Sequence, residues 1–314
     1  MRSLAVAALS AVLFWVAVTL VILLTSCGSK SDDDEDSGPP KVTTEQLAAL
    51  ESMSASIRQW APTCGSQHIA CEDGEDGDSM LWAGLLCFSG EGQQCVAAMA
   101  SIGSDGMVGR SPERVVARTE NSSSRDMLLG GLVAVTTTEN QGKANSILSY
   151  IEDHGNDLCE DATDNRCNVN PTQYAAVWGT MRKVWDHIGL DTTQDMRNGD
   201  LGDDTIIKLE SVFSAAGYAQ HLVGVHLLLR RAVDTWNSKT QSAADSLRKS
   251  QPNNPFFEFL SQGKTERAAA LTLKYCPKSR PASPTQWSWQ RDEAEQAWLS
   301  SMGWECIFMG NILH

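Results

Sequence analysis

Apolar residues recur every three to four positions along most of the chain after residue 42, and alternation with a period of two is scarce. This spacing places apolar side chains on one face of a helix. The clearest case is residues 171–190, where Asn170 can cap the helix, Pro171 occupies the first turn and Gly189 ends it. The pattern therefore predicts an all-α protein.

The same spacing predicts about twelve helices of two kinds. Residues 125–137 are apolar nearly all round, which predicts deep burial, whereas 171–190 carries a single apolar stripe. Twelve helices make six hairpins, and buried helices ringed by amphipathic ones form an (α/α)6 toroid. An irregular helical bundle is the alternative. The predicted helices are 44–60, 78–87, 96–102, 125–137, 142–154, 171–190, 204–216, 218–234, 242–249, 255–260, 265–275 and 292–300.

The beginning of the chain has the features of an export signal. Arg2 precedes an apolar run over residues 4–24, and the four residues that end at Cys27 read LTSC. This motif resembles the lipobox of bacterial lipoproteins, which implies cleavage before Cys27 and a diacylglycerol on its thiol. Gly28 follows the cysteine, which in that family favours the outer membrane. An uncleaved transmembrane anchor is the alternative, because 21 residues at about 1.5 Å each can span a bilayer core.

Three segments follow from this interpretation. Residues 1–26 are the predicted signal peptide, and 27–41 hold the lipidated cysteine and an acidic tether with five consecutive acids. Residues 42–314 form a single helical domain. We therefore expect an exported protein held in the bacterial cell envelope by a lipid anchor.

Composition narrows the possible partners. The chain of 314 residues has 25 basic and 39 acidic residues, a net charge of −14, and 42% hydrophobic residues. It has no basic patch or arginine-rich run, so the sequence predicts a globular protein that does not bind nucleic acid. The oligomeric state stays open.

Eight cysteines remain once Cys27 is assigned to lipid, and export exposes them to an oxidising compartment. No CxxC or HxxxH pair is present, so we expect disulfides, no metal and no cofactor. Three pairs would each close a short polar loop. The predicted disulfides are Cys64–Cys71, Cys87–Cys95, Cys159–Cys167 and Cys276–Cys306.

The most informative motif is Asp76-Gly77-Asp78, directly before an apolar helix. It resembles the Asp-Gly-Asp segment that enters an inner helix of six-hairpin glycosidases, where such carboxylates often act as general acid or base. The resemblance implies a catalytic role for Asp78. A helix N-terminus independently stabilises a carboxylate anion, and a plain N-cap is the alternative role.

A second carboxylate stands at the head of the most apolar helix. Asp126 lies 48 residues after Asp78, about one hairpin, so the two could begin neighbouring inner helices. Asp105 is the third candidate. Buried Asp105–Arg110 or Arg125–Asp126 ion pairs are the structural alternatives.

Five residues are candidates for substrate binding: Arg110, Arg125, His221, Trp289 and Arg291. Arginine binds hydroxyls or carboxylates and tryptophan stacks on sugar rings, so an arginine-rich mouth would favour an acidic sugar. A buried core role is the alternative for His221, and we expect Trp298 and Trp304 in the core.

Two functions remain open at this point. The first is a carbohydrate-active enzyme, a glycoside hydrolase with two carboxylates or a polysaccharide lyase. The carboxylate separation would then distinguish retention, at roughly 5–5.5 Å, from inversion, at roughly 6.5–9.5 Å. The second is a non-catalytic surface lipoprotein that binds a glycan or a protein partner.

Overall fold

The computed structural model describes residues 38–72, 75–119, 121–159, 165–200, 202–280 and 303–314. Within these ranges the chain folds into fourteen helices and one two-stranded antiparallel ribbon, β1 Thr63–Cys64 with β2 Ile69–Ala70. The helices are α2 Thr44–Arg58, α3 Ser79–Phe88, α4 Gly92–Ala100, α5 Pro112–Ala117, α6 Arg125–Thr138, α7 Gln141–Asp153, α8 Ala175–His187, α9 Gln194–Asp200, α10 Asp203–Phe213, α11 Tyr218–Ala232, α12 Ser238–Ser250, α13 Pro255–Gln262, α14 Glu266–Tyr275 and α15 Gly303–Leu313. The prediction of a mostly helical protein is confirmed.

The helix boundaries differ from the prediction in informative ways. Helix α8 begins at Ala175 and not at Pro171, because Gln173 and Tyr174 donate their backbone N–H groups to the Asn170 carbonyl and form a turn instead. Helices α5, α9 and α15 are absent from the prediction. Helix α15 is apolar all round and nearly all of it is buried, so its sequence has no periodicity to detect. The helix expected over 292–300 lies outside the described residues.

The described helices divide into buried and amphipathic ones, as the pattern predicts. Every residue from Ser79 to Cys87 in α3 and from Asp126 to Thr136 in α6 is buried. Helices α7, α10, α12 and α14 instead bury one face and expose the other. The first group supplies much of the hydrophobic core.

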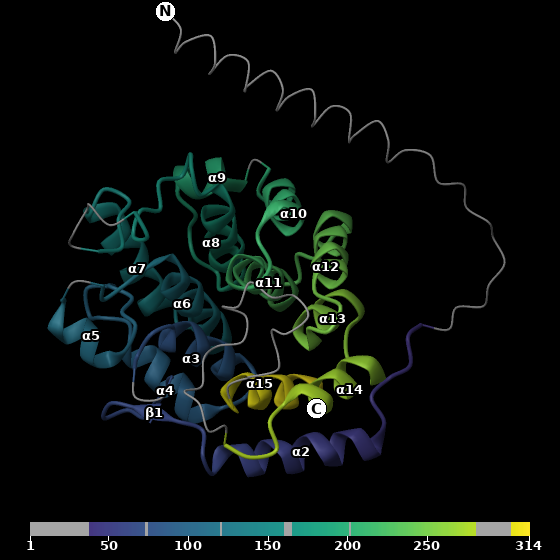
Figure 1. Ribbon diagram of the computed structural model, residues 1–314. Coiled ribbons are helices and arrows are strands. Elements are labelled where there is room, and N and C mark those ends of the chain that lie inside the picture. The colour runs from purple at the N-terminus through teal and green to yellow at the C-terminus, as the bar shows by residue number, and fades with distance from the viewer. Residues whose placement is uncertain (1–37, 73–74, 120, 160–164, 201, 281–302) are drawn as a thin grey trace, which may run out of the picture. The chain divides into compact units, whose positions relative to one another are not determined.

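The two ends of the described domain lie side by side. Helix α2 packs against α15, although most of the domain separates them in sequence (Figure 1). Trp304 of α15 is buried and donates its indole N–H to the Pro62 carbonyl at 2.6 Å. The expected core position of Trp304 is thus observed.

The structure contains four disulfides, and they are the pairs that the spacing predicts: Cys64–Cys71, Cys87–Cys95, Cys159–Cys167 and Cys276–Cys306. Four disulfides indicate an oxidising, extracellular environment. Among the described residues, no helix combines the length and the apolar character needed to cross a membrane. The expected lipid attachment at Cys27 lies outside the described residues.

Two glycines allow the backbones of α3 and α6 to touch. A Cβ added to Gly84 would lie 2.2 Å from the Gly130 carbonyl oxygen, and one added to Gly130 would lie 2.4 Å from the Met80 carbonyl oxygen. No residue with a side chain fits at such distances. This close packing brings the N-terminal ends of the two helices together, and each of those ends carries a candidate aspartate.

Candidate functional site

Asp78 and Asp126 meet at the N-terminal ends of α3 and α6. Their carboxyl groups share a hydrogen bond, and the residues are only 8% and 5% exposed. A hydrogen bond between two carboxyl groups requires a proton on one of them. The two predicted carboxylates therefore form a proton-sharing pair, which we call the dyad.

Asp78 occupies the N-cap position of α3, but its side chain makes no capping hydrogen bond. Its carboxyl bonds Asp126 instead, so Asp78 is the N-cap residue of α3 but does not cap the helix through its side chain. Burial, the charge of Asp126 and the hydrogen bond with it raise the pKa of Asp78 well above its usual 3.8, against the opposing charge of Arg110. These causes favour the protonated form of Asp78.

Asp126 is surrounded by hydrogen-bond donors. The Ser124 hydroxyl and the Tyr218 phenol both donate to its carboxylate. Burial and the charges of Asp126 and Asp78 raise the pKa of Tyr218 strongly, so the phenol keeps its proton. Asp126 therefore accepts hydrogen bonds from two hydroxyl groups at the N-terminus of α6.

Arg110 donates hydrogen bonds to several residues around the dyad. It donates to the Gly77 carbonyl at 2.6 Å, to the Asn121 carbonyl at 2.8 Å and to the Ser124 hydroxyl at 3.2 Å. Its distance to the Asp78 carboxylate is longer, 3.4 Å. The guanidinium is thus engaged mainly with neutral oxygens and is also the counter-ion of Asp78.

The dyad opens into a cavity of about 370 Å³. Three arginines line it, and one of them, Arg125, stacks on the Tyr174 ring at 4.2 Å and donates to the Asn168 carbonyl at 3.2 Å. Neither of these partners carries a negative charge. The complete lining is Asp78, Arg110, Ser124, Arg125, Asp126, Arg166, Tyr218 and Leu222. With three arginines and two aspartates, this lining has more basic than acidic residues.

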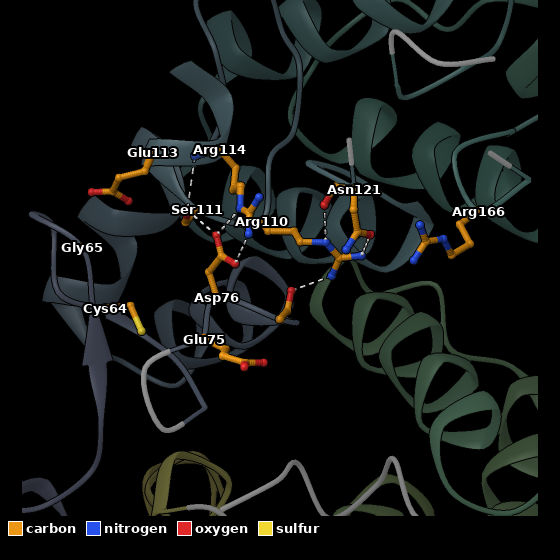
Figure 2. A pocket seen from close by; sticks show the side chains of 11 residues that line it. Cys64, Gly65, Glu75, Asp76, Arg110, Ser111, Glu113, Arg114, Asn121 and Arg166 are labelled. Atoms are coloured by element: carbon orange, nitrogen blue, oxygen red, sulfur yellow. Dashed lines mark hydrogen bonds and ion pairs between the residues drawn. The ribbon is translucent and has the colours of Figure 1, made fainter. Parts of the chain in front are cut away.

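A second, polar cavity of about 780 Å³ adjoins the first, since Arg110 and Arg166 line both. Figure 2 shows Arg110 between Arg166 and the ion pair of Asp76 with Arg114. Arg114 donates to the two oxygens of Asp76 at 2.7 and 3.1 Å. Asp76, the first residue of the Asp-Gly-Asp motif, is therefore an ion-pair partner and does not belong to the dyad.

The remaining predicted residues do not join the dyad. Asp105 is ion-paired with Arg118 at a partly exposed position, so the Asp105–Arg110 pair considered as a structural alternative does not form. His221 is fully buried, stacks on Trp82 with centroids 5.6 Å apart, and has a pKa lowered to about 3 by burial.

His221 thus takes the core role and cannot contact a ligand in this arrangement. The expected substrate contacts of Trp289 and Arg291, and the expected core position of Trp298, lie outside the described residues.

Sequence reasoning missed Ser124, Arg166 and Tyr218. Ser124 and Tyr218 have a local signal, because each stands at the start of an apolar helix, as Asp78 and Asp126 do. Arg166 lies in the loop closed by the Cys159–Cys167 disulfide. The backbone N–H of Arg125 donates to the Arg166 carbonyl at 3.0 Å and so ties this loop to α6. Nothing in the local sequence places that loop beside α6.

One group of side chains in the described residues has metal-ligand spacing: Asp157, Cys159 and Cys167. The two cysteines are joined in a disulfide and cannot provide thiolates, so the group does not fit a zinc site. Comparisons with protein-family models, curated proteins and solved structures found no match to this chain. Its function has to be inferred from the site alone.

Proposed function

We propose that the protein is an exported, lipid-anchored glycoside hydrolase that acts on a glycan containing an acidic sugar. The observation that supports this proposal is the hydrogen-bonded dyad of Asp78 and Asp126 in an arginine-lined cavity. Most glycoside hydrolases use two carboxyl groups, one protonated and one ionised, to cleave the glycosidic bond.

The surroundings assign a role to each carboxyl. Asp78, whose raised pKa favours the protonated form, acts as the general acid. Asp126, with two donors, acts as the nucleophile. Its carboxylate attacks the anomeric carbon while Asp78 gives its proton to the leaving oxygen, so the glycosidic C–O bond breaks and a glycosyl ester on Asp126 forms. Asp78 then deprotonates a water molecule that hydrolyses this ester.

The closeness of the dyad favours retention of configuration. A hydrogen bond holds two carboxyl oxygens within about 3 Å, which is nearer to the roughly 5–5.5 Å separation of retaining enzymes than to the roughly 6.5–9.5 Å of inverting ones. A small outward rotation of one carboxyl would make room for the substrate.

The three arginines favour an acidic sugar. Arg110, Arg125 and Arg166 line the dyad cavity, which contains only two acidic residues, Asp78 and Asp126. A uronic acid carboxylate would compensate the excess positive charge and accept charge-assisted hydrogen bonds.

The helix contacts support an (α/α)6 arrangement. Helices α3, α6, α8, α11, α13 and α15 each contact the next, and α15 contacts α3 again. The amphipathic helices pack outside these six. The dyad would then lie at the mouth of the toroid, where the inner helices begin.

The disulfides support export, and the LTSC motif at residues 24–27 supports a lipid anchor at Cys27. The acidic segment 28–41 would serve as the tether, and Gly28 after the cysteine favours the outer membrane.

A non-catalytic binding protein is the second candidate, and a specific observation favours it. The hydrogen bond of the dyad fills the space in which a scissile bond has to sit. If the carboxyls never separate, the arginines would bind an acidic glycan without cleaving it.

The test uses the full chain, produced with lipidation and extracted in detergent, on a panel of neutral and uronic acid polysaccharides. New reducing ends and unsaturated-sugar absorbance are measured together. We expect reducing ends without absorbance, and their loss in Asp78→Asn and Asp126→Asn. Asp105→Asn is the matched control, because Asp105 lies outside the dyad cavity and should keep its activity.

Three outcomes separate the alternatives. Absorbance at the unsaturated product would identify a lyase and overturn hydrolysis. Equal glycan retention by wild type and both dyad variants, without any product, would favour the binding protein. For an active enzyme, an NMR measurement of the first product anomer checks the expected retention.

A further inference from the structure

A third cavity, of about 220 Å³, adjoins the dyad cavity. Arg125 and Leu222 line both the third cavity and the dyad cavity. Its walls are mainly apolar and come from α6, α8, α10 and α11. The apolar lining residues are Leu129, Ala176, Val177, Ile206, Ala219, Leu222 and Val223.

Helix α10 carries an exposed apolar stripe next to this cavity. Phe213 is 74% exposed, Val212 54% and Leu209 41%. Only five large hydrophobic side chains of the described residues are exposed, and these three lie within five positions of one another. Single exposed apolar residues are ordinary, but a cluster of them usually has a partner.

The stripe and the cavity are continuous along α10. Ile206, Glu210 and Ser214 line the cavity at intervals of four residues. Leu209 is three positions from Ile206, and Phe213 is three from Glu210, so both lie on the helix surface beside the lining residues. An apolar path therefore leads from solvent over α10 to the dyad cavity.

We propose that the substrate is a glycolipid whose sugar lies at the dyad and whose acyl chain lies in the α8–α10–α11 cavity and along Leu209 and Phe213. This inference rests on the proposed function and specifies its substrate class. The arginines bind the charged sugar, and the apolar walls of the cavity contact the acyl chain. A membrane-anchored protein would meet such a substrate at the bilayer surface.

The surroundings of the cavity support an apolar occupant. Burial raises the pKa of Glu210, which shifts its carboxyl toward the neutral form in this wall. The positive charge of Arg125 sits at the boundary with the dyad cavity, stacked on Tyr174. The charged and the apolar halves of a ligand would therefore separate at Arg125.

The experiment compares methyl, butyl and hexyl glucuronides, which share one sugar and differ in chain length. The full chain is reconstituted in phosphatidylcholine nanodiscs, and binding is measured by calorimetry, with protein-free nanodiscs titrated in parallel. A fully buried methylene tightens binding up to about fourfold. With partial burial we expect hexyl glucuronide to bind at least about tenfold more tightly than methyl glucuronide.

Two substitutions test where the acyl chain of the ligand binds. Phe213→Ser and Ile206→Ser should remove most of the gain with chain length and leave methyl glucuronide binding unchanged. Val116→Ser is the matched control, because Val116 is 84% exposed on α5 and is not among the residues that line the apolar cavity. It should retain the full gain.

Several results would overturn the inference. Affinity independent of chain length would do so, as would a gain that Phe213→Ser leaves intact or that protein-free nanodiscs reproduce, since bilayer partitioning then explains it. If no glucuronide binds, 1-hexanol probes the cavity without a sugar, and its failure to bind also overturns the inference.

These results are distinguishable from failure of the proposed function. Hydrolysis that depends on the dyad, together with binding independent of chain length, would overturn only the glycolipid substrate. Binding that depends on chain length, with no hydrolysis of any glycan, would overturn only the hydrolase.

Discussion

Two clusters among the described residues place a pair of aspartates beside a buried arginine, and they are built differently. In the first, Asp203 and Asp204 at the start of α10 both bond Arg230 of α11, and Lys183 lies 3.4 Å from Asp203. Arg230 is fully buried, so this cluster is an internal ion network in which every carboxylate has a cation. We call it the ion network.

The dyad is the second cluster, and a single arginine serves its two carboxyls. Arg110 donates mainly to neutral oxygens and lies 3.4 Å from Asp78. The two carboxyls also bond each other, which requires a proton on one of them. The ion network uses cations to connect helices, whereas the dyad keeps a transferable proton beside a cavity. The comparison shows that partners and proton content, more than residue type, separate a structural cluster from a chemical one.

The same Asp→Asn substitution should have very different effects on stability in the two clusters. Asp203→Asn leaves buried Arg230 with one fewer counter-charge, and removing a partner from a buried ion pair costs about 3–5 kcal/mol. At pH 4, where folded Asp78 carries its proton, Asp78→Asn keeps a hydrogen-bonding group in its place, so we expect a change below about 1 kcal/mol at that pH. Urea unfolding of the variants measures both. Equal losses would remove the distinction between the clusters.

The pH dependence of stability sharpens the comparison further. The pKa of Asp78 in the folded chain lies well above 3.8, so the folded state binds this proton more tightly than the unfolded state does. Raising the pH above about 4 therefore destabilises the wild type, by up to about 1.4 kcal/mol per pH unit, until the folded pKa is passed. Asp78→Asn lacks this loss.

The free energy of unfolding of Asp78→Asn minus that of the wild type should thus grow as the pH rises from 4. Burial lowers the pKa of His221 and of His226 to about 3, and both proteins share this effect, so the difference isolates Asp78. A difference that stays constant from pH 4 to 8 would contradict a protonated Asp78.

The smallest expected effect comes from Tyr218. Tyr218→Phe removes one donor from the Asp126 carboxylate but keeps the ring. We expect about a tenfold loss of hydrolytic rate, equivalent to about 1.4 kcal/mol, and a shift of the acidic limb of the pH–rate profile to higher pH. Tyr174→Phe is the matched control, because Tyr174 contributes its ring to Arg125. An unchanged profile in Tyr218→Phe would assign this phenol to structure only.

Much of the fold was accessible from local patterns. The period of 3.6 predicts most of the helices, because amphipathic helices carry their burial in their own sequence. Helix α15 was not predicted for the opposite reason. A helix that is buried on nearly all sides has no regular alternation of apolar and polar positions. The short spacing of three cysteine pairs also predicts their partners, because a short loop keeps two thiols close.

The sequence by itself determined the helical class, the cysteine pairs and the aspartates that begin α3 and α6. Only the tertiary structure decided which of the candidates meet. Gly84 and Gly130 let α3 and α6 touch and so join Asp78 to Asp126, while Asp105 turns to Arg118 and His221 enters the core. Periodicity is a property of one helix, but a site belongs to the packing between helices. That packing depends on backbone distances and competing partners that no single segment contains.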